Sequence, residues 1–499
     1  MSVITYLVQN HFWIFAIWVV PMSVIYDLFY LAYTRVAYIF GPTFVKHEEK
    51  VKNVQKQVRQ WMEEGSKTPM CTARPCWKSI SLQTMNYKNR MHKVQINMPD
   101  IIHLDEEKRL VRVEPMVSIG QLNDFLISRG WTLPVVPELD DLTIGGLVMG
   151  GGIESTSHKY GLFQYICKAF EMITADGSVV WTDKDNDPEY FCAIPFSYGT
   201  LGFLTAVDLD IVPYKPYIKL TYEPVYSLDE VVAEFTRVTN DPTVESVEGI
   251  MFNLNEGVIM NGVFTDECEP DKLNYLAKWY SPWFYKHVET YLTKRQSGVE
   301  YIPTIDFYHR QNKAFFWLMP YIIPFANNVV FRYLFGWSMP PKFSLLKWLR
   351  KNLVPKEQNE NFVCQDFGYE LEKLQDSLKF VDEQTKVYPI WLCPTRHCVP
   401  EGLEYLNLFK REAVHVDVGI YGFSPIKGFK PEATQKRMER HAIDTGCYVA
   451  LYAETQLTRS DFDEMFEFNL RNYDKIRKRM NCEKAFPHVY EKISKLGRS

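Results

Sequence analysis

Glycine is concentrated in one short segment of this chain, TIGGLVMGGGIES, which runs from Thr143 to Ser155 and holds five glycines within eight positions. Residues without a Cβ atom let main-chain N–H groups approach a ligand closely and take up φ angles closed to other residues. We therefore expect an anionic cofactor here, with close backbone packing at a turn as the alternative. The predicted cofactor-binding residues are Thr143, Ile144, Gly145, Gly146, Leu147, Val148, Met149, Gly150, Gly151, Gly152, Ile153, Glu154 and Ser155.

The spacing of these glycines fits neither of the two common phosphate-binding fingerprints. A mononucleotide-binding loop requires Lys after its second glycine, but Gly150 is followed by Gly151. In a dinucleotide-binding fold a third glycine packs the helix on the strand, and Ser155 stands in that position. The segment therefore does not support an ATP or GTP cradle, and it supports a Rossmann fold only weakly.

Two further turns follow the glycine segment. FEMITADGSVV, from Phe170 to Val180, places an Ala-Asp-Gly turn between two apolar runs, which predicts a β-hairpin. SYGTLGFLTAVDLDIVP, from Ser197 to Pro213, predicts a glycine-rich turn that leads into an alternating strand. The predicted order is a glycine-rich loop, a hairpin, a second glycine-rich turn and a strand.

This order, with VRVEPMVSIGQLNDFL, TLPVVPELDDLTIGGLVMGGG and GTLGF, resembles flavoproteins of the vanillyl-alcohol oxidase and p-cresol methylhydroxylase superfamily. KTPMCTARPCW, IESTSHKYGLF, VYPIWLCP and NYLAKWYSPWFYKHVE resemble, more narrowly, the delta-24-sterol reductase family of the seladin or Diminuto type. These matches extend from Val45 to the C-terminus. The resemblance implies FAD, NADPH as reductant, reduction of the C24 side-chain double bond of sterol intermediates, and an endoplasmic-reticulum membrane.

The resemblance also implies how the flavin is held. Many superfamily members carry a His in the first phosphate loop that is joined covalently to the flavin, whereas this chain has Thr72-Ala73-Arg74-Pro75. We therefore expect noncovalent FAD, with Arg74 or nearby amides on its pyrophosphate. His158 is the only nearby alternative for a covalent link. No second dinucleotide fingerprint marks a site for NADPH.

The N-terminus carries a long apolar segment. Met1 to Thr34 contains no Lys or Arg, and residues 12–33 have Asp27 as their single charge. About 20 apolar residues suffice to cross a bilayer, and a cleaved signal peptide would begin with a basic region. We expect a single-pass anchor, with an interfacial hairpin as the alternative because of Pro21 and Asp27. Basic residues follow the segment, so the positive-inside rule predicts a cytosolic catalytic body on the endoplasmic reticulum, with a Golgi membrane also open.

Composition argues against a nucleic-acid partner, a metal site and a disulfide framework. Lys plus Arg number 56 against 61 Asp plus Glu, a net charge of −5, which argues against a nucleic-acid partner. The ten cysteines are dispersed and lack His partners at zinc-finger spacing, so no metal site and no disulfide framework are expected. The expected partners are a sterol and the lipid bilayer, and the sequence identifies no protein partner.

The fold class expected is α+β, with four parts: an anchor (12–33), an FAD-binding domain of two α+β subdomains (38–214), a cap or substrate domain (215–440) and a C-terminal helical segment that packs on the FAD domain (441–499). Helical spacing predicts an amphipathic helix that contains Val51, Val54, Val58, Trp61 and Met62. Cap strands are expected at 219–225, 387–394 and 413–422, with a helix at 228–236. We expect the aromatic, Pro-broken segment 279–348 to line a sterol channel or to dip into the bilayer surface.

The chemistry is easier to predict than its residues. Reduction of a C=C bond needs a hydride, which no side chain supplies, and a proton, which a side chain can supply. Plausible acids are His415, Tyr421, Tyr452 and Glu454, each with an ordinary structural role as the alternative, so no catalytic residue is assigned. Two other functions stay open: a flavin oxidase of the alcohol or sugar-lactone type, and a membrane-tethered sterol-binding protein. We expect Gly151→Val to abolish FAD retention.

Overall fold

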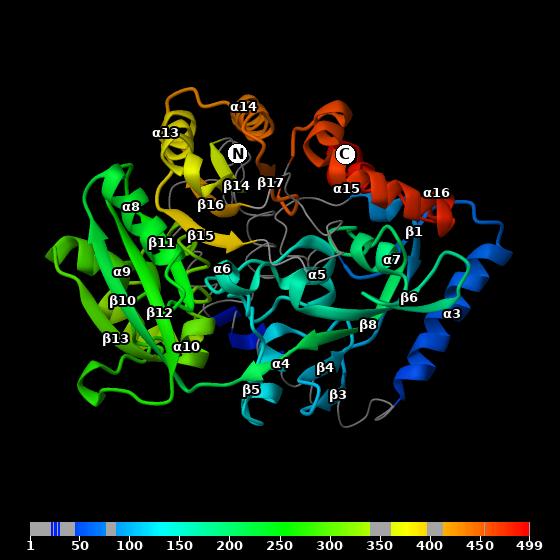
Figure 1. Cartoon of the computed structure of the whole chain (residues 1–499), viewed down its shortest axis with the longest axis horizontal. Helices are drawn as coiled ribbons and strands as arrows, with labels where there is room; N and C mark the ends of the chain where they lie inside the picture. Colours follow the sequence, from blue (N-terminus) through cyan, green and yellow to red (C-terminus); the bar gives the residue numbers. More distant parts are fainter. Residues whose placement is uncertain are drawn as a thin grey trace.

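Two antiparallel sheets organise the computed structural model, an α+β structure that describes residues 21–22, 24–26, 28–29, 45–75, 86–339, 361–396, 413–453 and 455–498 (Figure 1). The predicted anchor at 12–33 lies mostly outside these residues, as do the candidate acid Glu454 and residues 340–348 of the aromatic segment. Within the described part, every helix is too short or too polar to cross a bilayer.

The first sheet follows the order β3-β4-β8-β6-β7, and each neighbouring pair is antiparallel. Its central strand β8 is buried along all but its last residue, as expected for a strand covered on both faces. The predicted hairpin is confirmed, because β6 and β7 pair across the turn at Asp176 and Gly177. The strands are β3 (Ile101–Asp105), β4 (Leu110–Val113), β6 (Cys167–Ile173), β7 (Val179–Asp183) and β8 (Phe203–Asp210).

Short helices and two small sheets complete this unit. Strand β1 (Met70–Thr72) pairs in parallel with β2 (His92–Val94), and β5 (Trp131–Thr132) pairs with β9 (Val212–Pro213). The helices are α3 (His47–Glu63), α4 (Ile119–Ile127), α5 (Ile144–Gly150), α6 (Ser157–Tyr160) and α7 (Pro188–Ala193). Helix α3 buries Val51, Val54, Val58 and Trp61, which confirms the amphipathic helix, although Met62 is exposed.

A half-buried ionic contact joins helix α3 to the first sheet. Nδ1 of His47 donates to Glu114 and Nε2 donates to Glu171, both at 2.9 Å. Burial alone would lower the pKa of His47, but these hydrogen bonds and charges outweigh it and raise the pKa to about 9. His47 is therefore a cation at neutral pH and joins α3 to β6.

This contact makes stability depend on pH. Because the folded pKa lies above the ordinary value of 6.5, the stabilisation is complete below about pH 6.5 and is lost as pH rises through about 9. We expect His47→Gln to lower the free energy of unfolding by about 2 kcal/mol at low pH and by little above pH 9. Thermal melts of both proteins across this range measure the gap, and a gap that stays constant with pH would contradict the assignment.

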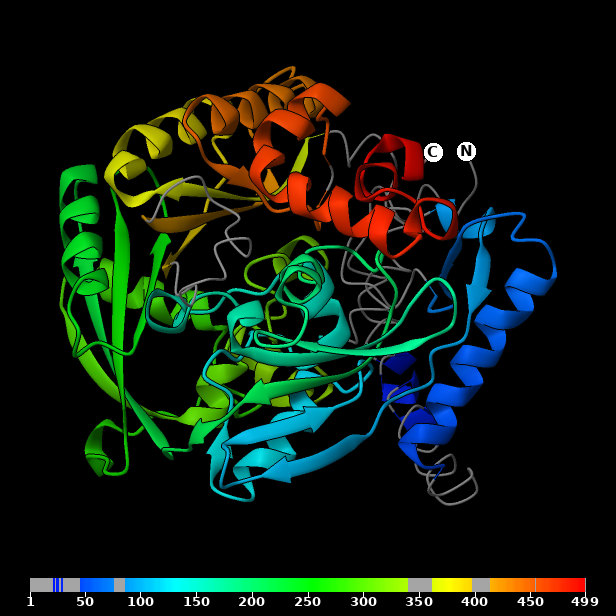
Figure 2. The same cartoon turned by 45° about the vertical axis from the view of Figure 1, so that its right-hand side comes forward.

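The second sheet has the order β13-β10-β12-β11-β15-β16-β14-β17. Four helices, α8 (Leu228–Thr239), α9 (Phe284–Lys294), α13 (Leu374–Thr385) and α14 (Pro431–Asp444), pack against its strands on the side away from the first unit (Figures 1 and 2). The other face turns toward the first unit, where α6 contacts β11 and β15. The strands are β10 (Tyr217–Val225), β11 (Ser246–Met251), β12 (Gly257–Thr265), β13 (Gly298–Pro303), β14 (Phe362–Glu370), β15 (Ile390–Arg396), β16 (Val414–Phe423) and β17 (Tyr448–Val449).

The C-terminal helices return to the first unit (Figure 2). In α15 (Arg459–Arg479), the Tyr473 hydroxyl lies 2.6 Å from that of Thr200, and Arg477 donates to the Thr200 carbonyl at 3.0 Å. Arg477 also binds the carbonyls of Phe486 and Pro487, which fixes the chain after α15. The remaining helices here are α16 (Cys482–Ala485), α17 (Val489–Ile493) and α18 (Lys495–Arg498).

Candidate active site

The glycine segment forms α5 and the irregular chain that follows it, between the two sheets. Two of its glycines are required by packing. A Cβ atom at Gly145 would lie 2.7 Å from Cβ of Pro115, and one at Gly152 would lie 2.9 Å from Cβ of Phe163. Both distances are shorter than van der Waals contact. These two positions therefore hold α5 close to its neighbours, which is the packing alternative considered above.

The other glycines leave the main chain open. Gly146 is exposed, and a Cβ there would meet only Oγ1 of Thr143, at 3.1 Å. At Gly150 the nearest atom would be a Tyr198 ring carbon at 3.8 Å, an ordinary contact. Gly151 has φ of 109°, so Gly151→Val would strain the backbone whether or not a phosphate lies nearby. Gly146 and Gly150 are thus the positions at which a ligand can reach the backbone.

Basic side chains gather beside this opening. Nη1 of Arg74 donates to Oγ1 of Thr143 at 2.6 Å, and Nζ of Lys88 binds the Arg74 carbonyl at 2.6 Å. Lys492 of α17 donates to the Tyr198 carbonyl, and burial together with the charge of Lys88 lowers its pKa to about 8. A pyrophosphate would be attracted by this cluster of cations. The residues present therefore fit an FAD pyrophosphate, and Lys88 and Lys492 are two contributors that no local motif identified.

The end of the predicted cofactor segment is occupied by protein contacts. Oε1 of Glu154 accepts from the Ser155 N–H at 2.8 Å and from Nη2 of Arg310 at 2.7 Å. Ile144, Leu147 and Val148 are buried in the core. Because these three side chains face the protein interior, a cofactor beside α5 can contact only the main chain at these three positions.

His158 is held by the main chain. Its Nδ1 lies 3.0 Å from the Ser155 carbonyl and its Nε2 lies 3.2 Å from the Val244 carbonyl. Burial lowers its pKa, so the ring is neutral. Both nitrogens are thus directed at backbone oxygens, which favours the noncovalent attachment expected for FAD.

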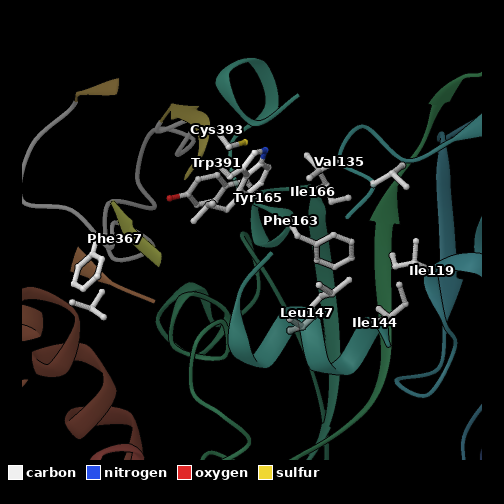
Figure 3. Close-up of a cluster of buried hydrophobic side chains, with 14 of the residues drawn as sticks. Ile119, Val135, Ile144, Leu147, Phe163, Tyr165, Ile166, Phe367, Trp391 and Cys393 are labelled. Carbon is white, nitrogen blue, oxygen red and sulfur yellow. The ribbon is translucent and has the colours of Figure 1, made fainter. Parts of the chain in front are cut away.

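The face of the second sheet that turns toward the glycine segment carries polar groups among aromatic ones. Cross-strand partners lie on the same face of a sheet, and β14, β16 and β15 align Gly368 with Asp417 and Cys393. Figure 3 shows Trp391 and Cys393 of β15 close to Tyr165 of the first unit. This polar face consists of Glu248, Asp366, Trp391, Cys393, Asp417, Tyr421 and Tyr448.

Two buried carboxyl groups lie on the polar face. Asp366 accepts a hydrogen bond from the Tyr421 hydroxyl and another from Tyr452, and burial raises its pKa to about 6. Asp417 is 2% exposed, and its Oδ2 has no hydrogen-bond partner among the described residues. Burial, then the charges of Asp366 and Glu138, raise the pKa of Asp417 well above its usual range. Burial of Asp417 therefore favours the protonated form of its carboxyl group.

The acids considered from the sequence have different surroundings. Tyr421 and Tyr452 both bind Asp366, so two of the candidates meet at one carboxyl. The Nδ1 of His415 lies 3.1 Å from the Ala413 carbonyl, and burial lowers the pKa of His415 to about 4. Asp366 and Asp417 were not identified from the sequence as candidate acids. The signal that could have found Asp417 is a charged residue inside the otherwise apolar strand VHVDVGIYG.

A buried ionic cluster joins the two units at this site. Nε and Nη2 of Arg310 bind both carboxylate oxygens of Glu248 at 2.7 and 2.9 Å, and Nη2 also binds Glu154. Nε1 of Trp391 donates to Glu248 at 3.1 Å. Glu138 lies nearby, and burial, followed by the charge of Glu154, raises its pKa well above the usual range. Arg310 thereby joins Glu154, at the end of the glycine segment, to Glu248 of β11.

Comparisons with known proteins agree with this site. The family described as FAD binding domain matches residues 68–183, which include Arg74 and the whole glycine segment. The chain is 44% identical to the delta(24)-sterol reductase of Homo sapiens over 97% of this chain and 94% of that protein. It is 39% identical to the Caenorhabditis elegans homologue (98% and 96% covered) and 36% identical to the Arabidopsis thaliana enzyme (97% and 92% covered). The chain belongs to the delta(24)-sterol reductase family.

Proposed function

We propose that this protein reduces the C24 side-chain double bond of sterol intermediates, with FAD as its cofactor and NADPH as the reductant. The observation that carries the proposal is the pairing of an FAD-binding segment with a buried, acidic and aromatic sheet face opposite it. The full-length similarity to delta(24)-sterol reductases supports the same reaction. The oxidase alternative is not favoured, because the similarity to delta(24)-sterol reductases extends over 97% of this chain.

One group of residues would bind FAD and the sterol, and another would supply the proton. The open backbone at Gly146 and Gly150, with Arg74, Lys88 and Lys492, would bind the FAD pyrophosphate without a covalent link. Bound FAD supplies a hydride acceptor for NADPH and a hydride donor for the alkene. Trp391 and the other aromatic groups would orient the sterol side chain and exclude water. The Asp417 carboxyl, whose raised pKa favours the protonated form, would give its proton to the second alkene carbon.

The location follows from the N-terminal sequence. Residues 12–33 would anchor the chain once in the endoplasmic-reticulum membrane, because this apolar segment is long enough to span the hydrocarbon core. Basic residues after the segment would keep the catalytic body in the cytosol. A protease-protection assay on intact microsomes tests this orientation, and a protected body would contradict it.

The reaction is tested on the purified, detergent-solubilised full chain without oxygen. We expect a flavin absorption band that NADPH bleaches, and that returns when a sterol with a C24 double bond is added. The same sterol with a saturated side chain is the control and should leave the flavin reduced. Reoxidation by air alone would instead indicate an oxidase, and a preparation without flavin would indicate a binding protein.

The phosphate contact is tested by Gly150→Ala. The added Cβ would make only an ordinary contact with Tyr198, so the protein should fold normally but lose FAD affinity about tenfold or more as the methyl group keeps the phosphate from the backbone. Fluorescence titration of the apoprotein with FAD measures this. Gly145→Ala is the contrasting variant, because its clash with Pro115 should lower the melting temperature. If the FAD affinity of Gly150→Ala were unchanged, the pyrophosphate would not lie at Gly150.

A further inference from the structure

The segment around α11 (Val329–Phe335) places large apolar side chains in solvent. Val330 is 62% exposed, Leu334 58% and Trp337 58%. A soluble surface rarely gathers so many large apolar groups, and such a patch marks an interaction site. The exposed apolar side chains of this patch, which we call the α11 patch, are Trp279, Tyr321, Val329, Val330, Tyr333, Leu334, Phe335 and Trp337.

The patch is built as one surface. The Tyr333 ring stacks on Tyr280 at a centroid distance of 5.4 Å and meets the Trp279 ring edge-on at 6.0 Å. Arg332 donates to the Tyr280 carbonyl, which ties α11 to the preceding loop. The Asn328 side chain accepts from the Val330 N–H at 2.9 Å and caps the helix. The apolar groups are thus held outward by a fixed framework.

The patch continues inward to the polar face of the second sheet. The Phe331 ring lies between those of Phe325 and Phe335, at 5.3 and 5.4 Å. Farther back along the same chain segment, the Phe316 ring packs against Trp391 at 5.2 Å and against Tyr421 at 5.1 Å. The same chain segment therefore places one group of aromatic side chains at the polar face and another at the exposed patch, and aromatic groups suit a rigid apolar substrate.

The charge of the segment indicates the partner. No Asp or Glu occurs between Asp306 and Glu357, and the basic residues of this stretch other than the buried Arg310 are Lys313, Arg332, Lys342, Lys347, Arg350, Lys351 and Lys356. Lys278 is exposed beside the patch, with Nζ 4.2 Å from the centre of the Tyr275 ring. Tryptophan and tyrosine with lysine and arginine are typical of surfaces that insert into the interface of a bilayer with anionic lipids. A protein partner would require no such one-sided charge.

We infer that the α11 patch docks on an anionic bilayer surface, at which a sterol leaves the lipid for the candidate active site. Docking here is separate from the N-terminal anchor, and it orients the second sheet toward the membrane. The sterol transfer, though not the docking itself, rests on the proposed function. The partner is a lipid surface, because exposed Trp, Tyr and aliphatic side chains beside an exposed Lys278 fit the interface of a bilayer with anionic lipids.

The docking is tested by hydrogen exchange on the full chain in vesicles of phosphatidylcholine with a minor fraction of phosphatidylserine. The double variant Val330→Glu/Leu334→Glu should keep its flavin spectrum and melting temperature, because both side chains are exposed. We expect the amides of 329–338 to exchange about tenfold faster in the variant than in the wild type. Val179→Glu, an exposed apolar position on β7, is the matched control and should change nothing.

Turnover separates docking from catalysis. With sterol supplied in vesicles, the double variant should show a KM raised about tenfold at unchanged kcat, whereas sterol delivered in cyclodextrin should give wild-type values. Equal exchange at 329–338 in wild type and variant would overturn the docking. If the protection of the 329–338 amides from exchange depended on protein concentration and not on vesicles, the patch would bind a second copy of the chain and the membrane docking would be wrong. Absence of turnover with either sterol supply would instead contradict the proposed function, while the exchange result would still decide the docking.

Discussion

Arg310→Leu is expected to lower the free energy of unfolding by about 3–5 kcal/mol and the melting temperature by about 10 °C. The side chain of Arg310 is fully buried, and it neutralises the carboxylates of Glu154 and Glu248, whose side chains are also buried. Removal of the guanidinium leaves two acids in a medium of low polarity without a counter-charge. Differential scanning fluorimetry of the purified protein measures the shift.

FAD should be lost before the protein unfolds. Glu154 directly follows Ile153 at the end of the glycine segment, and Arg310 holds it against β11. Released from this contact, the chain after Gly150 would shift, and Gly150 would move away from the position that leaves it open to a ligand. Flavin fluorescence recorded during the same melt should therefore rise at a lower temperature than the protein transition.

An exposed arginine with acidic partners is the matched control. Arg440 binds Asp444, Asp461 and Glu464 at the surface, where water screens the charges, so Arg440→Leu should leave the melting temperature nearly unchanged. Neutralising the orphaned acids, in Arg310→Leu/Glu154→Gln/Glu248→Gln, should recover part of the loss. If Arg310→Leu were as mild as Arg440→Leu, the cluster would not hold the two units together.

The order of elements in the first unit could be predicted because it depends on neighbouring residues. The Ala-Asp-Gly turn fixes the hairpin of β6 and β7, and the spacing of Val51, Val54 and Val58 fixes the buried side of α3. The glycine segment stands out for the same reason, since the lack of Cβ atoms is a property of the residues themselves. What each glycine does was not predictable. Gly145 meets Pro115, a contact that no local pattern contains.

The second unit shows where prediction from sequence ends. The cap strands at 219–225, 387–394 and 413–422 correspond to β10, β15 and β16, because alternation and turn residues mark strands locally. Their neighbours in the sheet are not local: β16 lies between β15 and β14, and this pairing sets Asp417 on the same face as Asp366. Arg310 and Glu154 are likewise 156 positions apart. Residues that meet only through strand pairing or distant packing are not separated by a fixed number of positions, so no sequence motif can identify them.

Asp417→Asn is expected to slow sterol-dependent reoxidation of the reduced flavin by about 10²–10⁴-fold, the usual contribution of a positioned general acid. The substitution keeps the shape of the side chain and removes its proton. Burial and the charge of Asp366 raise the pKa of Asp417 and so disfavour its charged form, which an uncharged Asn does not need, so the fold should lose little stability. Reduction of the flavin by NADPH needs no proton from Asp417 and should keep its wild-type rate in a stopped-flow measurement.

The pH dependence separates a proton donor from a residue that only supports the site. In the wild type the reoxidation rate should fall as pH rises, because the donor must be protonated, and this dependence should disappear in Asp417→Asn. Glu439→Gln is the control: Glu439 is buried on α14, its pKa is raised to about 7 by burial, and its carboxylate binds the Gln456 N–H away from the polar face. Its replacement should leave both half-reactions unchanged. Equal slowing of flavin reduction and reoxidation in Asp417→Asn would mean that the carboxyl positions the flavin and that the proton comes from elsewhere, with the Tyr421 and Asp366 pair as the next group to test.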